Sequence, residues 1–168
     1  VGQAGVNNVQ TLDILASNDG ANTIKLTPGS GGTASLVFNS RSVTDDASLN
    51  IVGSDPANNK VTINTGLTAG ALIDRVYIDG NEFAISTGGV LRAPIYGTDA
   101  GFVTSATALT ATDTNEITGS FTTAGSITID ALKINGGHTL IIDGPDTLTI
   151  RTGAVNTDGS ILATGGSS

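Results

Sequence analysis

The sequence predicts an all-β protein, specifically a parallel β-solenoid whose short strands stack in successive coils. Three observations support this: runs of alternating polar and apolar residues, a glycine-rich composition, and a two-strand phrase that recurs along the chain. Of 168 residues, 23 are glycine and only 13% are charged, while Met, Trp and Cys are absent. Long amphipathic helices need more Leu, Glu, Lys and Met than this chain contains. A helical bundle is therefore excluded.

Strict alternation marks the clearest strands. It occurs in Thr23–Thr27, Lys60–Asn64, Ser126–Asp130 and Thr147–Arg151. Alternation with a period of two is typical of half-buried strands. We expect Lys25, Tyr77, Thr128 and Thr149 to point outward and the apolar residues to form one continuous aliphatic core. The expected core pairs are Ile24/Leu26, Leu36/Phe38, Val61/Ile63, Val76/Ile78, Phe83/Ile85, Ile127/Ile129, Leu140/Ile142 and Leu148/Ile150.

The recurring phrase has the form apolar-x-Ile-x-Gly, a turn, then apolar-x-Ile-x-Thr-Gly. It occurs at residues 49–66, 76–88 and 140–153. The spacing from Gly66 to Gly88 predicts coils of about 22 residues, within the range of solenoid repeats. Stacked copies would bury inner faces that a single copy leaves exposed.

The domain organisation expected from the sequence is simple. Residues 1–164 should form a single solenoid domain, and Gly165–Ser168 resembles a linker or cut point. Because the sequence starts at Val1 and contains no Met, we expect a processed chain or a piece of a longer protein. The alternative fold is a β-sandwich filament subunit whose segment Val9–Leu15 completes a neighbouring subunit.

The charge pattern argues against two classes of partner. The formal net charge is −8, and the seven basic residues are scattered singly between Lys25 and Arg151. Nucleic acids and anionic membrane surfaces require clustered Lys or Arg, so neither is an expected partner. No apolar run approaches the roughly 18 residues of a membrane-spanning helix, so we expect no membrane insertion.

Several phrases resemble a known class of surface protein. Asn22–Leu26, Ala34–Asn39, His138–Gly144 and Asp146–Gly153 resemble the β-strand repeats of bacterial autotransporter passengers and related giant surface proteins. The resemblance implies a right-handed parallel β-helix outside a bacterial cell, acting as adhesin, stalk or fibre. It implies no shared catalytic residues.

Catalytic residues are not expected. The single histidine, His138, follows two glycines and is interpreted as a turn or strand-edge residue, because a triad needs a nucleophile and an acid beside it. Asp79 and Asp143 occupy equivalent turn positions about three coils apart, or roughly 15 Å at the usual strand spacing. Glycoside hydrolysis needs two carboxylates at roughly 5–10 Å. We therefore expect no enzymatic activity and no cofactor.

Calcium is the one ion with candidate ligands. Asp45, Asp46, Asp143 and Asp146 are interpreted first as turn formers, since Asp bonds to downstream backbone amides. The sequence lacks the spacing of a β-roll or EF-hand site. These four residues are thus candidates for adventitious calcium binding only.

Taken together, these features predict a non-enzymatic structural or adhesive segment of a bacterial cell-surface or extracellular fibre. Its expected partners are like subunits or adjoining coils of the same chain, end to end, and a host surface or carbohydrate. Two alternatives remain open: a small β-helical carbohydrate-active enzyme, and a pilin-like β-sandwich subunit completed by a neighbour's strand.

Overall fold

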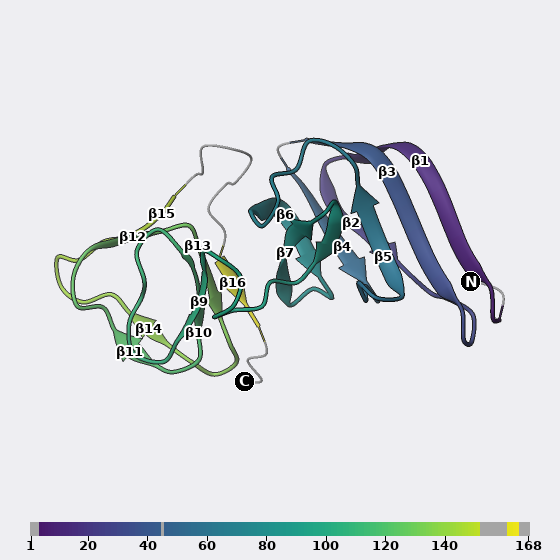
Figure 1. Cartoon of the computed structure of the whole chain (residues 1–168). Helices are drawn as coiled ribbons and strands as arrows, with labels where there is room; N and C mark the ends of the chain where they lie inside the picture. Colours follow the sequence, from purple (N-terminus) through teal and green to yellow (C-terminus); the bar gives the residue numbers. More distant parts are fainter. Residues whose placement is uncertain (1–3, 45, 152–160, 165–168) are drawn as a thin grey trace. The chain divides into compact units, whose positions relative to one another are not determined.

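The computed structural model describes residues 4–44, 46–151 and 161–164, and these residues form strands and turns only. The chain divides into two compact units, Val1–Ala93 and Pro94–Ser168 (Figure 1). The all-β prediction is confirmed. The expected single domain over residues 1–164 stays a prediction, and the expected linker at Gly165–Ser168 lies outside the described residues.

The first unit is one eight-stranded mixed sheet with the order β1-β3-β5-β8-β7-β6-β4-β2. Its strands are β1 (Asn7–Ser17), β2 (Gly20–Lys25), β3 (Thr33–Val43), β4 (Ala47–Val52), β5 (Asn59–Ile63), β6 (Leu72–Ile78), β7 (Glu82–Thr87) and β8 (Val90–Arg92).

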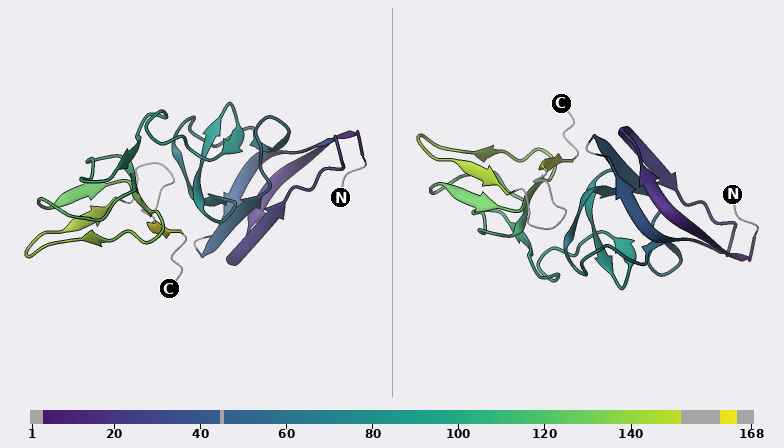
Figure 2. Two further views of the ribbon diagram at one scale, coloured as in Figure 1. Left: turned by 90° about the horizontal axis from the view of Figure 1, so that it is seen from below. Right: turned by 90° about the horizontal axis from the view of Figure 1, so that it is seen from above.

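Two parallel arms and an antiparallel junction make up this sheet. Strands β1, β3 and β5 run parallel to one another, as do β2, β4 and β6. Strands β6, β7 and β8 pair antiparallel, β8 pairs antiparallel with β5, and the two arms are thereby joined. Because β2 follows β1 closely in the sequence, the two edges of the sheet approach each other. The result is a nearly closed, barrel-like sheet, visible in Figures 1 and 2.

An aliphatic core fills the inside of this sheet. Leu49 and Ile51 of β4 and Val61 and Ile63 of β5 are buried, and they pack in one cluster with Phe38 of β3. Alternation in each strand places these side chains on one face, as period-two geometry requires. Burying each such side chain contributes about 1.5–3 kcal/mol, so this core is the main stabilising feature of the unit.

The junction begins with a tight hairpin. Asp79 and Gly80 both have positive φ angles, 52° and 71°, and Asn81 N donates to Ile78 O at 3.2 Å. These are the features of a type I′ turn, for which Asp-Gly is a preferred pair. The turn sends β7 back antiparallel to β6.

The second unit contains three small parallel sheets, ordered β16-β13-β10-β9, β11-β14 and β12-β15. Its strands are β9 (Phe102–Ser105), β10 (Thr114–Ile117), β11 (Phe121–Thr122), β12 (Ile127–Ile129), β13 (Ala131–Ile134), β14 (Leu140–Ile141), β15 (Leu148–Ile150) and β16 (Ile161–Ala163). Ile117, Ile129 and Leu132 form its buried core, and Phe121 and Leu148 pack against them.

The predicted core is largely confirmed in its residues but not in its continuity. The expected pairs from Ile24/Leu26 to Phe83/Ile85 belong to the first unit, and those from Ile127/Ile129 onward belong to the second. The two units have separate hydrophobic clusters. Ile142 is an exception, since 45% of its surface is exposed. Lys25, Thr128 and Thr149 are exposed as expected, whereas Tyr77 is half-buried.

The parallel β-helix prediction, with coils of about 22 residues, is wrong. The phrase at 76–88 is not one coil but the antiparallel hairpin of β6 and β7, within a mixed sheet. The spacing between paired strands is also not constant: cross-strand hydrogen bonds span 26 residues at Asn7 and Thr33 but 17 at Glu116 and Lys133. In place of the predicted right-handed solenoid, the structure contains a nearly closed mixed sheet and three small parallel sheets.

The alternative β-sandwich filament subunit is also wrong, because the strands do not form two facing antiparallel sheets. Val9–Leu15, expected to complete a neighbour, lies within β1 and pairs in parallel with β3 of its own unit.

The fold requires glycine at position 119, because there is no room for a side chain. A Cβ atom there would lie 2.7 Å from Ala106 O and 2.9 Å from Ala106 Cβ. We expect Gly119→Ala to destabilise the second unit by about 1–3 kcal/mol, because the backbone at Ala106 must move. Urea unfolding followed by circular dichroism measures this. Thr107→Ala, at a neighbouring exposed side chain, should leave the midpoint unchanged; equal midpoints for both variants would contradict the close approach.

Candidate functional site

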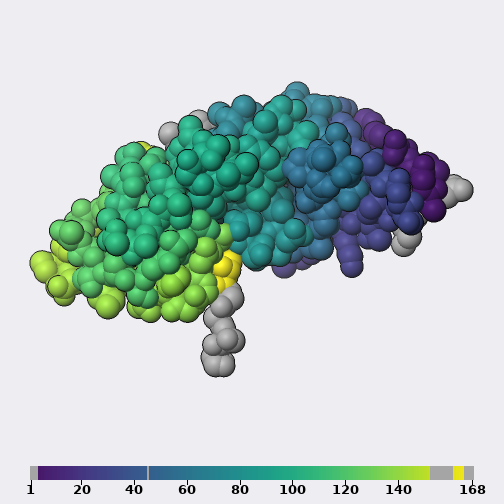
Figure 3. All heavy atoms as spheres, turned by 60° about the horizontal axis from the view of Figure 1, so that its bottom comes forward, coloured from purple at the N-terminus to yellow at the C-terminus, as the bar shows by residue number. Residues whose placement is uncertain are grey.

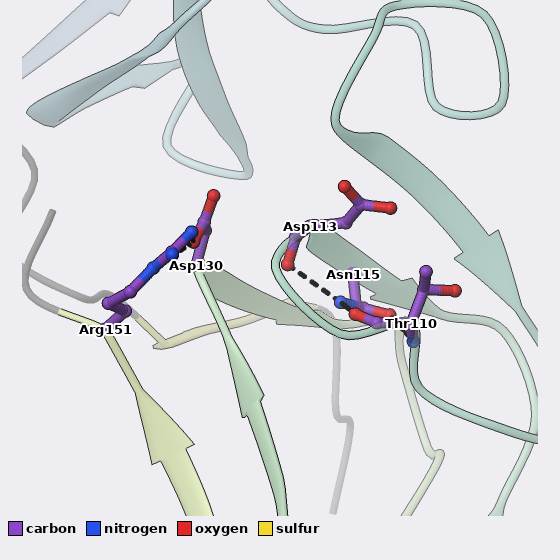
Figure 4. Close-up of polar contacts among 5 residues, drawn as sticks. All are labelled: Thr110, Asp113, Asn115, Asp130 and Arg151. Atoms are coloured by element: carbon purple, nitrogen blue, oxygen red, sulfur yellow. Dashed lines mark hydrogen bonds and ion pairs between the residues drawn. The ribbon is translucent and has the colours of Figure 1, made fainter.

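Carboxylates are the most numerous charged groups in the chain, and several of them connect neighbouring strands. Figure 4 shows Asp130, which follows β12, and Arg151, which follows β15, pointing toward each other. Arg151 Nε donates to Asp130 Oδ1 at 2.9 Å, and a second guanidinium nitrogen also contacts that oxygen. Both side chains are more than one-third exposed, so the pair adds little to stability.

A buried amide holds the loop before β10. Asn115 is fully buried, and its Oδ1 accepts from Thr110 N at 2.7 Å. Its Nδ2 donates to Thr110 O and to Asp113 O, both at 2.9 Å (Figure 4). All the polar atoms of this amide are thus engaged with backbone, and its role is to fix the loop.

A buried ion pair connects β10 and β13. Lys133 is only 3% exposed, and its Nζ donates to Glu116 Oε1 at 3.0 Å. Asn135 Nδ2 donates to the same oxygen at 2.8 Å, and the Lys133 ammonium lies 5.3 Å from the centre of the Tyr96 ring. Burial alone would raise the pKa of Glu116, but the hydrogen bonds from Lys133 and Asn135 and the charge of Lys133 outweigh it and lower that pKa. Glu116 is therefore a carboxylate held in its charged form.

The three residues that were considered for catalysis and rejected lie in turns. His138 is half-buried in a turn, where its backbone N donates to Asn135 O at 3.3 Å. Asp79 belongs to the first unit, and its Oδ1 accepts from Gly53 N at 2.8 Å. Asp143 belongs to a turn of the second unit.

The calcium candidates occupy turns. Asp146 N donates to Asp143 O at 3.0 Å, so these two residues close one turn, and Asp46 O accepts from Gly20 N at 3.0 Å. Asp45 lies outside the described residues. Within the part of the chain that the structure describes, no three His, Asp or Glu side chains are grouped to hold a metal ion. Calcium binding at these residues stays a prediction.

The most conspicuous surface feature is the open edge of β1. This strand has eleven residues and pairs only with β3, so the other side of its backbone is not paired within the sheet. Three of its apolar side chains are exposed: Val9 by 68%, Leu12 by 42% and Ile14 by 54%. Figure 3 shows part of the purple segment that follows the grey residues at the surface of the molecule. Long apolar edges of this kind are sites for pairing with another strand.

A hollow of about 350 Å³ adjoins this edge. Gln10 of β1, Leu26 after β2 and Leu36 of β3 contribute to its wall, together with Lys25. Leu26 belongs to the core of the first unit, and Leu36 packs against that core. The end of the aliphatic core is thus incompletely covered beside β1.

Side-chain hydrogen bonds also connect β1 to the neighbouring strand β3. Asn64 Nδ2 donates to Asn39 Oδ1 at 3.4 Å, and Asn39 Nδ2 donates to Asp13 Oδ1 at 3.2 Å. A second contact joins Thr33 Oγ1 to Asn7 Oδ1 at 3.1 Å. In both cases the residue on β1, Asp13 or Asn7, accepts the hydrogen bond through a side-chain oxygen.

A smaller hollow of about 250 Å³ lies in the second unit. Phe121, Leu109 and several threonines contribute to its wall, among them Thr123, whose buried Oγ1 has no hydrogen-bond partner. Phe121 thus provides an aromatic surface in this hollow, and the remaining walls consist mostly of small residues.

No protein-family model, curated protein or solved structure matches this chain. No helix in the described residues is long and apolar enough to cross a membrane. Sequence reasoning missed the edge of β1 as a surface. A signal was present in the sequence: the segment with Val9, Leu12 and Ile14 has Asp13 as its one charged residue and no Pro, so it lacks the residues that usually protect an edge strand from pairing.

Proposed function

We propose that this chain is a non-enzymatic structural or adhesive segment of a bacterial cell-surface or extracellular fibre. The observation that carries this proposal is the long, apolar, open edge of β1, beside an incompletely covered core. Such an edge is suited to joining another strand, which is how fibre segments bind like subunits or adjoining parts of the same chain.

The use of the carboxylates supports a structural role. Glu116 binds Lys133 of the neighbouring strand, Asp130 binds Arg151, and Asp79 accepts from the backbone of Gly53. Each of these groups links segments that are adjacent in a sheet. Two-carboxylate chemistry instead requires a facing pair that is free to act on a substrate.

The surface location is supported by the sequence. Asn22–Leu26 and Asp146–Gly153 resemble strand repeats of bacterial surface proteins, and the absence of Cys suits export without disulfide chemistry. Adhesion to a host surface or carbohydrate would use the hollow at Phe121 and Thr123.

Two assays test this proposal. Antibodies against the chain should label intact cells of the bacterium that encodes it, and labelling only after lysis would overturn the surface location. The purified chain should release no reducing ends from a panel of polysaccharides. Product formation that disappears in Asp130→Asn, while that variant stays folded, would establish the enzyme instead.

A further inference from the structure

We propose that the open edge of β1 pairs antiparallel with the β1 edge of a second copy of this chain, forming a two-fold symmetric dimer. This inference rests on the proposed function and deepens it, because like subunits would then meet in pairs at β1. It specifies the partner, the strand and the register.

Length favours this partner over the other edge strands of the described residues. β1 has eleven residues, whereas the edge strands β2 and β9 have six and four, and β14, β15 and β16 have two or three. Strand β3 also has eleven residues but is paired on both sides, so among the described edge strands only a second β1 can pair with the whole of this edge. A self-complementary patch of this kind is the usual basis of a two-fold dimer.

The register of full overlap follows from the strand bounds. Antiparallel pairing over Asn7–Ser17 places Asn7 opposite the second copy's Ser17, and it places Leu12 opposite the second copy's Leu12 on the two-fold axis. Leu12 is paired with Phe38 of β3, a core residue, so it lies on the core side of the sheet. The two leucines would then contact each other across the axis, and each would bury part of a side chain that is 42% exposed in the single chain.

The polar residues of β1 also fit this register. Asp13 lies opposite the second copy's Thr11, so each Thr11 hydroxyl can donate to a carboxylate. Asp13 already accepts from Asn39, and a carboxylate has further acceptor capacity. The one charged group of the edge thus gains a donor in the pair.

Cysteine trapping tests the register directly, because the natural chain has no Cys. Opposite residues of an antiparallel pair have Cα atoms about 4.5–5.5 Å apart, within the range of a disulfide. Mild oxidation of Leu12→Cys should therefore give a disulfide dimer on a non-reducing gel. Ile95→Cys, at a residue of the second unit that is 58% exposed, is the matched control and should stay largely monomeric.

Sedimentation equilibrium of the Cys-free chain provides the second measurement. The natural chain should show a reversible monomer–dimer equilibrium, and Val9→Lys/Ile14→Lys should weaken it at least tenfold. Ile95→Lys should leave it unchanged. A strict monomer at high concentration, equal trapping of Leu12→Cys and Ile95→Cys, or open-ended multimers through β1 would each overturn the proposal.

Discussion

Ile51→Asp should unfold the first unit. Ile51 is fully buried in β4, within the cluster formed by both arms of the sheet. Removing the apolar side chain costs about 2–5 kcal/mol, and an unpaired buried carboxylate adds to that cost. The sum is comparable with the whole stability of a domain, about 5–15 kcal/mol. Circular dichroism and hydrogen exchange of the β3, β4 and β5 amides would measure the loss.

The matched control is Ile14→Asp. Ile14 has the same side chain in the same unit but is 54% exposed on β1, so at a protein concentration at which the chain is monomeric the change should cost less than about 1 kcal/mol. A normally folded Ile51→Asp variant, or equal destabilisation by both changes, would contradict the assignment of Ile51 to the core.

The sequence predicted the strands better than their arrangement. Alternation identified Lys60–Asn64 and Ser126–Asp130 correctly, because burial of one face fixes the period whatever the sheet topology. The same alternation gives no information on which strands become neighbours. Register and direction depend on turns and on contacts between distant residues.

A comparison of two Asp-Gly turns illustrates this limit. Asp79-Gly80 closes a hairpin, whereas Asp143-Gly144 is followed by Pro145, and the strands on either side of it join different parallel sheets. Pro has no backbone N–H and a fixed φ, so the second turn cannot reproduce the first. Treating both phrases as copies of one coil led to the solenoid prediction.

The candidate site was only partly predictable. Val9–Leu15 was named only as the donor strand of the β-sandwich alternative, and its position on a sheet edge depends on the pairing of β1 with β3 across 26 residues. The Glu116–Lys133 pair was not predicted, since nothing in the sequence shows that these residues become neighbours on β10 and β13. Contacts of this range require the fold.

Glu116→Gln should destabilise the second unit by about 2 kcal/mol near neutral pH. The change leaves the buried Lys133 ammonium without its carboxylate, and breaking one side of a buried pair is costly. The Glu116 side chain keeps 14% exposure, which moderates the effect. Asp130→Asn removes a carboxylate from the exposed pair with Arg151 and should cost less than about 1 kcal/mol.

The pH dependence separates the charge of Glu116 from its packing. The folded-state pKa of Glu116 lies below its ordinary value of 4.5, so its carboxylate stabilises the fold above that value. This stabilisation should disappear as the pH falls through the lowered pKa, and Gln, which does not titrate, should lack that dependence. The difference in unfolding free energy between the natural chain and Glu116→Gln should therefore shrink below about pH 4.5, as measured by hydrogen exchange of the β10 and β13 amides. A difference that stays constant down to pH 2 would show that Glu116 acts through packing and hydrogen bonding alone, and not through its charge.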